Sequence, residues 1–153
     1  MELVVFTSGV KLGGAEKVLF EDYSKRIKRR VKFRALDSGN VRDKDGILRL
    51  AGLAQNDKAR LTDFVVVLDK NGQKFDNLSF AKKLDGVMSS GGYKRVIFVI
   101  GGAYGVDEEV KLRANLIWSF SEQVFPHKLF AVMLAEQIYR SLEIIAGSPY
   151  HHE

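Results

Sequence analysis

The C-terminal tail of the sequence gathers side chains that can bind or move a proton. Tyr150, His151, His152 and Glu153 follow one another directly after Pro149. Because the pKa of free imidazole lies close to neutral pH, a tail of this kind can serve proton transfer or phosphate binding. Adjacent histidines point in different directions and no third ligand stands at a clear spacing, so we expect no metal site. The candidates for catalysis are therefore Tyr150, His151 and His152.

Three further segments could form a ligand site, because each follows a stretch of strand-like sequence. They span residues 69–74, 101–105 and 119–126. Ligands of open parallel sheets bind beyond the carboxyl ends of the strands, and glycine lets the backbone approach a ligand closely. The second segment, Gly-Gly-Ala-Tyr-Gly, has neither the spacing of a dinucleotide-binding loop nor the Gly-Lys-Ser/Thr of a phosphate-binding loop. No serine stands in a nucleophile elbow either.

A basic run is a second candidate for ligand contact. Residues 25–34 contain seven Lys or Arg and no acid, in a chain with 24 basic and 19 acidic residues and a formal charge of +5. One interpretation is a surface that contacts the phosphates of a nucleic acid. The other is a solvated helix end, whose cations are favoured by the helix dipole. The sequence leaves both interpretations open.

The elements that must position these segments alternate between strand and helix. Short apolar runs with strand character lie at 3–6, 31–36, 64–68, 96–100 and 116–120. Helical stretches lie at 15–29, 46–60, 77–90 and 107–114, and a last helix spans 127–146. The third and fourth apolar runs are continuous and rich in β-branched residues, as strands buried on both faces are. This order predicts an α/β fold with a mostly parallel sheet flanked by helices.

The last helical stretch is apolar on more than one face. A helix that is apolar nearly all round must be buried nearly all round, whereas helices of a small domain normally keep one face in water. A second copy of the chain is the simplest cover for the extra face, so we expect a homodimer through this helix. The alternative is a central helix in an unusually thick core.

Composition sets the broad class of the protein. The chain has 153 residues, of which 46% are hydrophobic, and no repeat or linker divides it, so we expect one domain over residues 1–153. The sequence has no run of about 18 uncharged apolar residues, so we expect no membrane span, and its first residues lead us to expect no signal peptide. Cysteine is absent, which excludes disulfides and is typical of the reducing cytoplasm.

Five motifs, in one order, resemble a known family. They are Leu-Asp-Lys-Asn-Gly at 68–72, Gly-Gly-Ala-Tyr-Gly at 101–105, Trp-Ser-Phe-Ser-Glu-Gln-Val-Phe-Pro-His at 118–127, Leu-Ala-Glu-Gln-Ile-Tyr-Arg at 134–140 and Pro-Tyr-His at 149–151. Together they resemble the RlmH family of the SPOUT class, the methyltransferases that modify N3 of a pseudouridine in large-subunit ribosomal RNA. The resemblance covers essentially the whole chain, and its most specific parts are residues 119–140 and the Pro-Tyr-His ending.

The resemblance implies a fold, a cofactor and a substrate. The fold would be a SPOUT domain whose C-terminal segment forms a deep trefoil knot, and the protein would be a homodimer. The cofactor S-adenosylmethionine would contact positions carried over by motif: Leu68, Gly101, Phe120, Ser121, Glu122, Gln123, Val124 and Phe125. The substrate would be a pseudouridine of 23S ribosomal RNA within the ribosome. The side chains expected to contact this RNA are Arg26, Arg29, Arg30, His127 and Arg140.

The sequence departs from the family pattern at two places. Ala103 and Tyr104 stand where the family often has Pro-Glu, and His152 stands where it commonly has arginine. The expected reaction is in-line methyl transfer to N3, with His151, or the tail acting through water, as the base and Tyr150 stacking on or hydrogen-bonding to the substrate. A non-catalytic RNA- or ribosome-binding module that retains the fold, and a small-molecule methyltransferase, are the alternatives.

Overall fold

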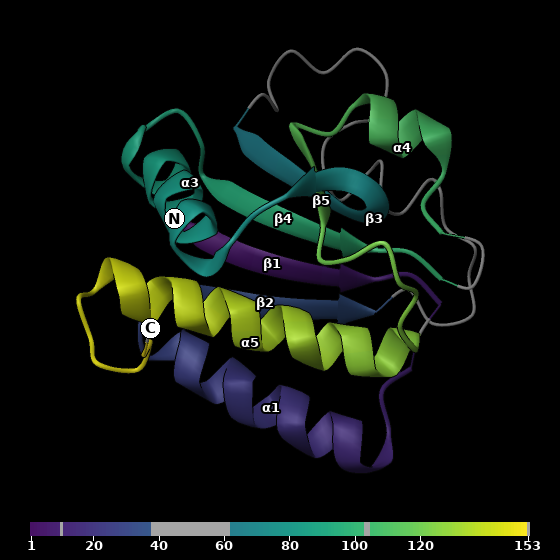
Figure 1. Ribbon diagram of the computed structural model, residues 1–153, viewed down its shortest axis with the longest axis horizontal. Helices are drawn as coiled ribbons and strands as arrows, with labels where there is room; N and C mark the ends of the chain where they lie inside the picture. The colour runs from purple at the N-terminus through teal and green to yellow at the C-terminus, as the bar shows by residue number, and fades with distance from the viewer. Residues whose placement is uncertain (10, 38–61, 103–104, 153) are drawn as a thin grey trace.

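A single parallel sheet organises the protein, for which a computed structural model describes residues 1–9, 11–37, 62–102 and 105–152 (Figure 1). The strands are β1 (Glu2–Thr7), β2 (Lys32–Asp37), β3 (Asp63–Lys74), β4 (Arg95–Ile100) and β5 (Leu116–Ser119). Their order across the sheet is β2-β1-β4-β3-β5, and each adjacent pair is parallel. The predicted strands and their parallel arrangement are therefore confirmed.

Helices cover both faces of this sheet. They are α1 (Gly14–Lys28), α3 (Asn77–Ser89), α4 (Glu108–Leu112) and α5 (His127–Ile145). Figure 1 shows α1 and α5 side by side along the sheet. These helices confirm four of the predicted stretches, the last helix among them, whereas the helix predicted at 46–60 lies outside the described residues. No helix within the described ranges has the length and hydropathy needed to cross a bilayer.

Alternating side chains of the central strands supply two cores. Leu3 and Val5 of β1 pack in the core formed with α1, α3 and α5, whereas Val4 and Phe6 pack on the opposite face with Val110 of α4. Full burial of one such aliphatic side chain contributes roughly 1.5–3 kcal/mol. Because both faces are covered, the central strands need the continuous apolar runs that the sequence shows.

Helix α5 is buried along most of its length within one copy of the chain. It packs against α1 and α3, and its buried residues are Ala131, Val132, Leu134, Ala135, Ile138, Ser141, Leu142 and Glu143. Two of its apolar side chains, Leu129 and Ile145, remain exposed, as do Val18 and Leu19 of the neighbouring α1. Contacts within one chain therefore bury more than one face of α5. The homodimer through this helix stays a prediction.

Strand β3 is longer than the sequence predicts. A loop is expected at residues 69–74, but the strand continues to Lys74 after an irregularity in its pairing between Leu68 and Gln73. The reason is a close approach at Gly72, where an added Cβ would lie 2.6 Å from the carbonyl carbon of Ile117. Since glycine has no Cβ, β3 can bend against β5 and pair with it again at Gln73.

Candidate functional site

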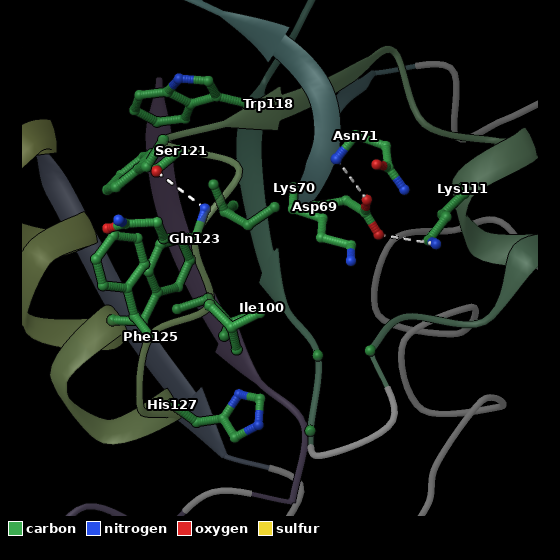
Figure 2. Close-up of a pocket in the computed structure, with 17 residues that line it drawn as sticks. Asp69, Lys70, Asn71, Ile100, Lys111, Trp118, Ser121, Gln123, Phe125 and His127 are labelled. Atoms are coloured by element: carbon green, nitrogen blue, oxygen red, sulfur yellow. Dashed lines mark hydrogen bonds and ion pairs between the residues drawn. The ribbon is translucent and has the colours of Figure 1, made fainter.

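A pocket opens at the carboxyl ends of β3, β4 and β5 (Figure 2). Its volume is about 490 Å³, within the range of roughly 300–1,000 Å³ that small-molecule sites occupy. It is lined by Leu68, Asp69, Lys70, Asn71, Ile100, Gly101, Gly102, Gly105, Lys111, Trp118, Phe120, Ser121, Gln123, Val124, Phe125, His127 and Phe130. The three segments that the sequence singles out therefore meet at one edge of the sheet, as expected for an open parallel sheet.

The glycine segment after β4 makes one wall of the pocket. The amide of Gly105 donates to the carbonyl oxygen of Gly102 at 2.9 Å, which closes a tight turn. A Cβ added at Gly101 would lie 2.4 Å from the carbonyl carbon of Gly105, and Gly105 itself has φ of +78°. Only glycine at position 101 leaves this backbone undisturbed, so a side chain there must open the turn.

The segment after β5 is tied to the extension of β3. The hydroxyl of Ser119 lies 2.9 Å from the carbonyl oxygen of Lys70 and 3.1 Å from that of Ser121. The amide of Gln123 then donates to the hydroxyl of Ser121 at 3.0 Å. These hydrogen bonds fix the conformation of the loop beside the pocket, although the loop contains no regular secondary structure.

Aromatic rings form the apolar side of the pocket. The ring centroid of Phe120 lies 4.6 Å from that of Trp118 and 4.8 Å from that of Phe130, and Phe125 stacks on Phe130 at 6.0 Å. Trp118 is in turn stacked on Phe80 of α3 at 3.6 Å. These aromatic rings therefore pack against the core and provide a flat apolar surface for a ligand.

Charged and polar groups form the opposite side, as Figure 2 shows for Asp69, Asn71 and Lys111. The Nζ of Lys111 lies 2.8 Å from Asp69, whose other carboxylate oxygen accepts from the amide of Asn71 at 2.9 Å. Burial raises the pKa of Asp69, but the hydrogen bonds from Lys111 and Asn71 outweigh it and hold that pKa below its usual value. The same hydrogen bond raises the pKa of Lys111. Both groups therefore stay charged at neutral pH.

Most of the cofactor-contacting residues carried over from the family line this pocket. Seven of the eight do so: Leu68, Gly101, Phe120, Ser121, Gln123, Val124 and Phe125. Glu122 points elsewhere and forms an exposed ion pair with Lys74. The structure adds Lys111, which the sequence analysis missed because α4 reaches the pocket only through the packing of distant segments.

A second cluster of functional groups lies along the C-terminal half of α5. The Oε1 of Glu136 accepts hydrogen bonds from the Nε and Nη2 of Arg140, at 3.0 and 2.7 Å, and from the hydroxyl of Tyr150 at 3.2 Å. Arg140 also places its Nη1 3.2 Å from the Nδ1 of His151. Burial, a hydrogen bond with Tyr23 and the charge of Glu136 raise the pKa of Tyr150 to about 12. Tyr150 is therefore a neutral hydroxyl at neutral pH.

The expected RNA-contacting residues fall into two groups. His127 begins α5 and lines the pocket, whereas Arg140 belongs to the tail cluster. Arg26 pairs with Asp22 and lies over the rings of Tyr23 and Tyr139, beside that cluster.

One arginine of the basic run pairs with a carboxylate of α5. Arg30 donates from Nε and Nη2 to the buried carboxylate of Glu143, at 2.8 and 3.0 Å. Arg29 is exposed and next to it along the chain, and His152 of the tail is exposed as well. The structure thus brings the tail and the basic run together at one end of α1 and α5.

The pocket and the tail cluster lie at different places along α5, because the pocket is lined by His127 at the start of the helix, whereas His151 contacts Arg140. At about 1.5 Å per residue, these two helix positions are separated by roughly 20 Å along the axis. The expected catalytic residues Tyr150, His151 and His152 are therefore not brought to the pocket of their own chain. No three His, Asp or Glu side chains gather in the described part of the protein to form a group suited to a metal ion.

Similarity to known proteins identifies the family of the chain. A family model described as "Predicted SPOUT methyltransferase" matches residues 1–151. The chain belongs to the SPOUT methyltransferase family. The resemblance found from the sequence motifs is thus confirmed.

Named relatives agree with this family. The ribosomal RNA large subunit methyltransferase H of Christiangramia forsetii is 38% identical over 147 residues, which cover 89% of either chain. The protein of the same name from Clostridium beijerinckii is 33% identical and covers 99% of either chain. Among solved structures, the SpoU methyltransferase AviRb of Streptomyces viridochromogenes, crystallised with AdoMet, aligns with a TM-score of 0.53. It is 8% identical, over 95% of this SPOUT chain and 58% of its own, so the likeness concerns the fold alone.

Proposed function

We propose that the protein transfers the methyl group of S-adenosylmethionine to ribosomal RNA of the large subunit. Membership of the SPOUT family and the names of the relatives support this activity. The observation that carries it is the pocket at the carboxyl edge of the sheet, where a glycine turn, an aromatic wall and a charged pair surround about 490 Å³.

The residues of the pocket fit S-adenosylmethionine. The rings of Phe120, Phe125 and Phe130 provide flat surface for an adenine, and the turn at Gly101 brings main-chain groups close to a ligand. The carboxylate of Asp69 is suited to accept hydrogen bonds from hydroxyl or ammonium groups. When bound, the cofactor supplies a methyl group on a positively charged sulfur, which a nucleophilic nitrogen accepts in line.

The finer proposal is methylation of N3 of a pseudouridine in 23S ribosomal RNA within the ribosome. Tyr150, His151 and His152 are its catalytic candidates, and Arg29 is an exposed member of the basic run. The proximity of the tail to the basic run supports a surface that binds RNA near the reacting base. We further infer one SPOUT domain over residues 1–153 with a C-terminal trefoil knot, acting in the cytoplasm.

The distance between pocket and tail supports a homodimer with shared sites. In one chain roughly 20 Å of helix separates His127 of the pocket from Arg140 of the tail cluster, whereas methyl transfer requires the reacting atoms to be about 3–3.5 Å apart. A partner whose tail faces the pocket of the first chain would complete each site. The exposed apolar side chains Val18, Leu19, Leu129 and Ile145 provide surface for such a contact.

The direct test is transfer of labelled methyl from S-adenosylmethionine to ribosomes that lack the modification, with naked ribosomal RNA and RNA-free buffer alongside. We expect label in the large-subunit RNA, with ribosomes labelled faster than naked RNA. Cofactor binding without label would favour a non-catalytic RNA-binding module, and label without any RNA would favour a small-molecule methyltransferase. Either result would contradict the proposal.

A matched pair of glycine variants tests the pocket itself. Gly101→Val places a side chain against the backbone of Gly105, whereas Gly86→Val on α3 places one where nothing lies within 4 Å of the Cβ. We expect calorimetric titration with S-adenosylmethionine to show at least about tenfold weaker binding for Gly101→Val, which corresponds to about 1.4 kcal/mol. Gly86→Val should bind as the wild type does. Equal affinities for the two variants would place the cofactor elsewhere.

A further inference from the structure

The tail cluster fixes the hydrogen-bonding role of His151. Arg140 lies between two acceptors, since its Nε and Nη2 donate to Glu136 and its Nη1 lies 3.2 Å from the Nδ1 of His151. A guanidinium has only donors and is charged at every accessible pH. The Nδ1 of His151 must therefore be the acceptor in this contact, and the neutral ring must carry its proton on Nε2.

This tautomer is incompatible with the role of a base. A neutral imidazole that removes a proton through Nε2 must already carry one on Nδ1, and the imidazolium that results also carries a proton there. In the structure that proton would point at the N–H of Arg140, with donor against donor and positive charge beside positive charge. The carboxylate of Glu136 cannot relieve this contact, because its Oε1 accepts from Arg140 and from the hydroxyl of Tyr150, and its Oε2 accepts from the Nε2 of Gln137 at 2.8 Å.

We propose that Glu136 and Arg140 are positioning residues that hold His151 as an Nε2–H donor, so that it donates to a carbonyl oxygen of the target base rather than removing its proton. The proposal rests on the proposed methyltransferase function. Glu136 and Arg140 are suited to the task because their side chains are largely buried, 17% and 26% exposed, and joined by two hydrogen bonds. Tyr150 closes the cluster from the tail itself.

A donor of this kind favours the loss of the N3 proton that must precede methyl transfer. The N3 atom of a uracil-type base stands between two carbonyl groups, and negative charge spreads onto their oxygens when N3 loses its proton to water. The bond from N3 to the methyl carbon then forms while the bond from that carbon to sulfur breaks, which leaves a neutral thioether. His151 keeps its proton and stabilises the negative charge on oxygen in the deprotonated base, as donors of an oxyanion hole stabilise an oxyanion.

Substitutions of His151 separate a donor from a base. In His151→Gln the amide nitrogen can replace Nε2 as a donor, whereas no amide can act as a base. We expect the single-turnover rate of His151→Gln to stay within about tenfold of the wild type, and that of His151→Ala to fall by about 10²–10³-fold. Equal losses in the two variants would overturn the proposal.

The tautomer can be measured without any substrate. Long-range ¹H–¹⁵N correlation spectra of the full-length protein labelled in histidine should show His151 with its proton on Nε2, after assignment through His151→Gln. Arg140→Met should convert this signal to a mixture of the two neutral forms, whereas Lys83→Met, an exposed residue of α3, should leave it unchanged. A proton on Nδ1 in the wild type would overturn the proposal even if the protein methylated no RNA. Absence of methylation with the expected tautomer would instead contradict only the proposed function.

Discussion

Complementation between two inactive variants tests whether each active site is shared by two chains. Gly101→Val disables the pocket, and His151→Ala disables the tail. The pocket is lined by His127 at the start of α5, whereas His151 contacts Arg140 farther along the helix. At about 1.5 Å per residue, the two helix positions are roughly 20 Å apart along the axis. The structure therefore holds His151 away from the pocket of its own chain.

The expected yield follows from random pairing. When the two variants exchange subunits in equal amounts, half of the dimers contain one chain of each kind, and each of these has one site with an intact pocket and an intact tail. The mixture should then recover about one quarter of the wild-type methyl transfer, while either variant alone has almost none. Mixed dimers isolated through two different affinity tags should recover about one half.

The assay is the transfer of labelled methyl to unmodified ribosomes at fixed total protein. Circular dichroism and light scattering serve as controls that each variant is folded and dimeric. A mixture in which mixed dimers are verified but activity stays at the level of the single variants would refute the shared site. It would require the tail of each chain to reach its own pocket by a rearrangement of α5.

Three further predictions concern the end of α5 that carries the tail. Arg30→Met leaves the buried carboxylate of Glu143 without its partner, so we expect the free energy of unfolding to fall by about 1–2 kcal/mol at pH 7, measured with urea. The hydrogen bond from Arg30 lowers the pKa of Glu143, so this stabilisation is present above the ordinary value of 4.5 and is lost as the pH falls below it. The effect of Arg30→Met should therefore shrink as the pH is lowered from about 5, and a Lys28→Met control should leave the stability unchanged. Replacing Arg29 together with Arg30 by Ala should weaken the binding of ribosomal RNA. The slope of the logarithm of the binding constant against the logarithm of the salt concentration should fall by roughly 0.7–0.9 for each phosphate that the protein no longer neutralises. An unchanged slope would exclude a phosphate-binding role for these arginines. In an absorbance titration, wild type and Tyr150→Phe should coincide until the pH approaches 12, because the pKa of Tyr150 is raised to about 12, and an earlier divergence would contradict its burial.

The sequence alone determined the sheet and the location of the pocket. The continuous apolar runs at 64–68 and 96–100 predicted strands buried on both faces, because only a covered parallel sheet removes both faces of a strand from water. Since parallel strands place their carboxyl ends at one edge, the segments at 69–74, 101–105 and 119–126 were expected to meet. They do meet, and the motifs of the family located seven residues of the pocket in advance.

Other features depended on contacts between residues far apart in the chain. Gly72 lets β3 continue past its expected end only because the backbone of Ile117 lies against it. Lys111 reaches the pocket through Asp69, and Arg30 is held by Glu143, which is 113 residues away. No periodicity or spacing encodes such pairs, because each depends on how separate elements pack.

The C-terminal tail shows most clearly which features the sequence determined and which depended on the tertiary structure. The sequence determined that Tyr150, His151 and His152 could do chemistry, because phenol and imidazole groups can donate, accept or transfer protons at neutral pH. Only the tertiary structure decided that this tail packs on the C-terminal half of α5, away from the pocket of its own chain, and that Arg140 faces the Nδ1 of His151. Residue types fix which reactions are available, but distance and the direction of each hydrogen bond fix which reaction can take place.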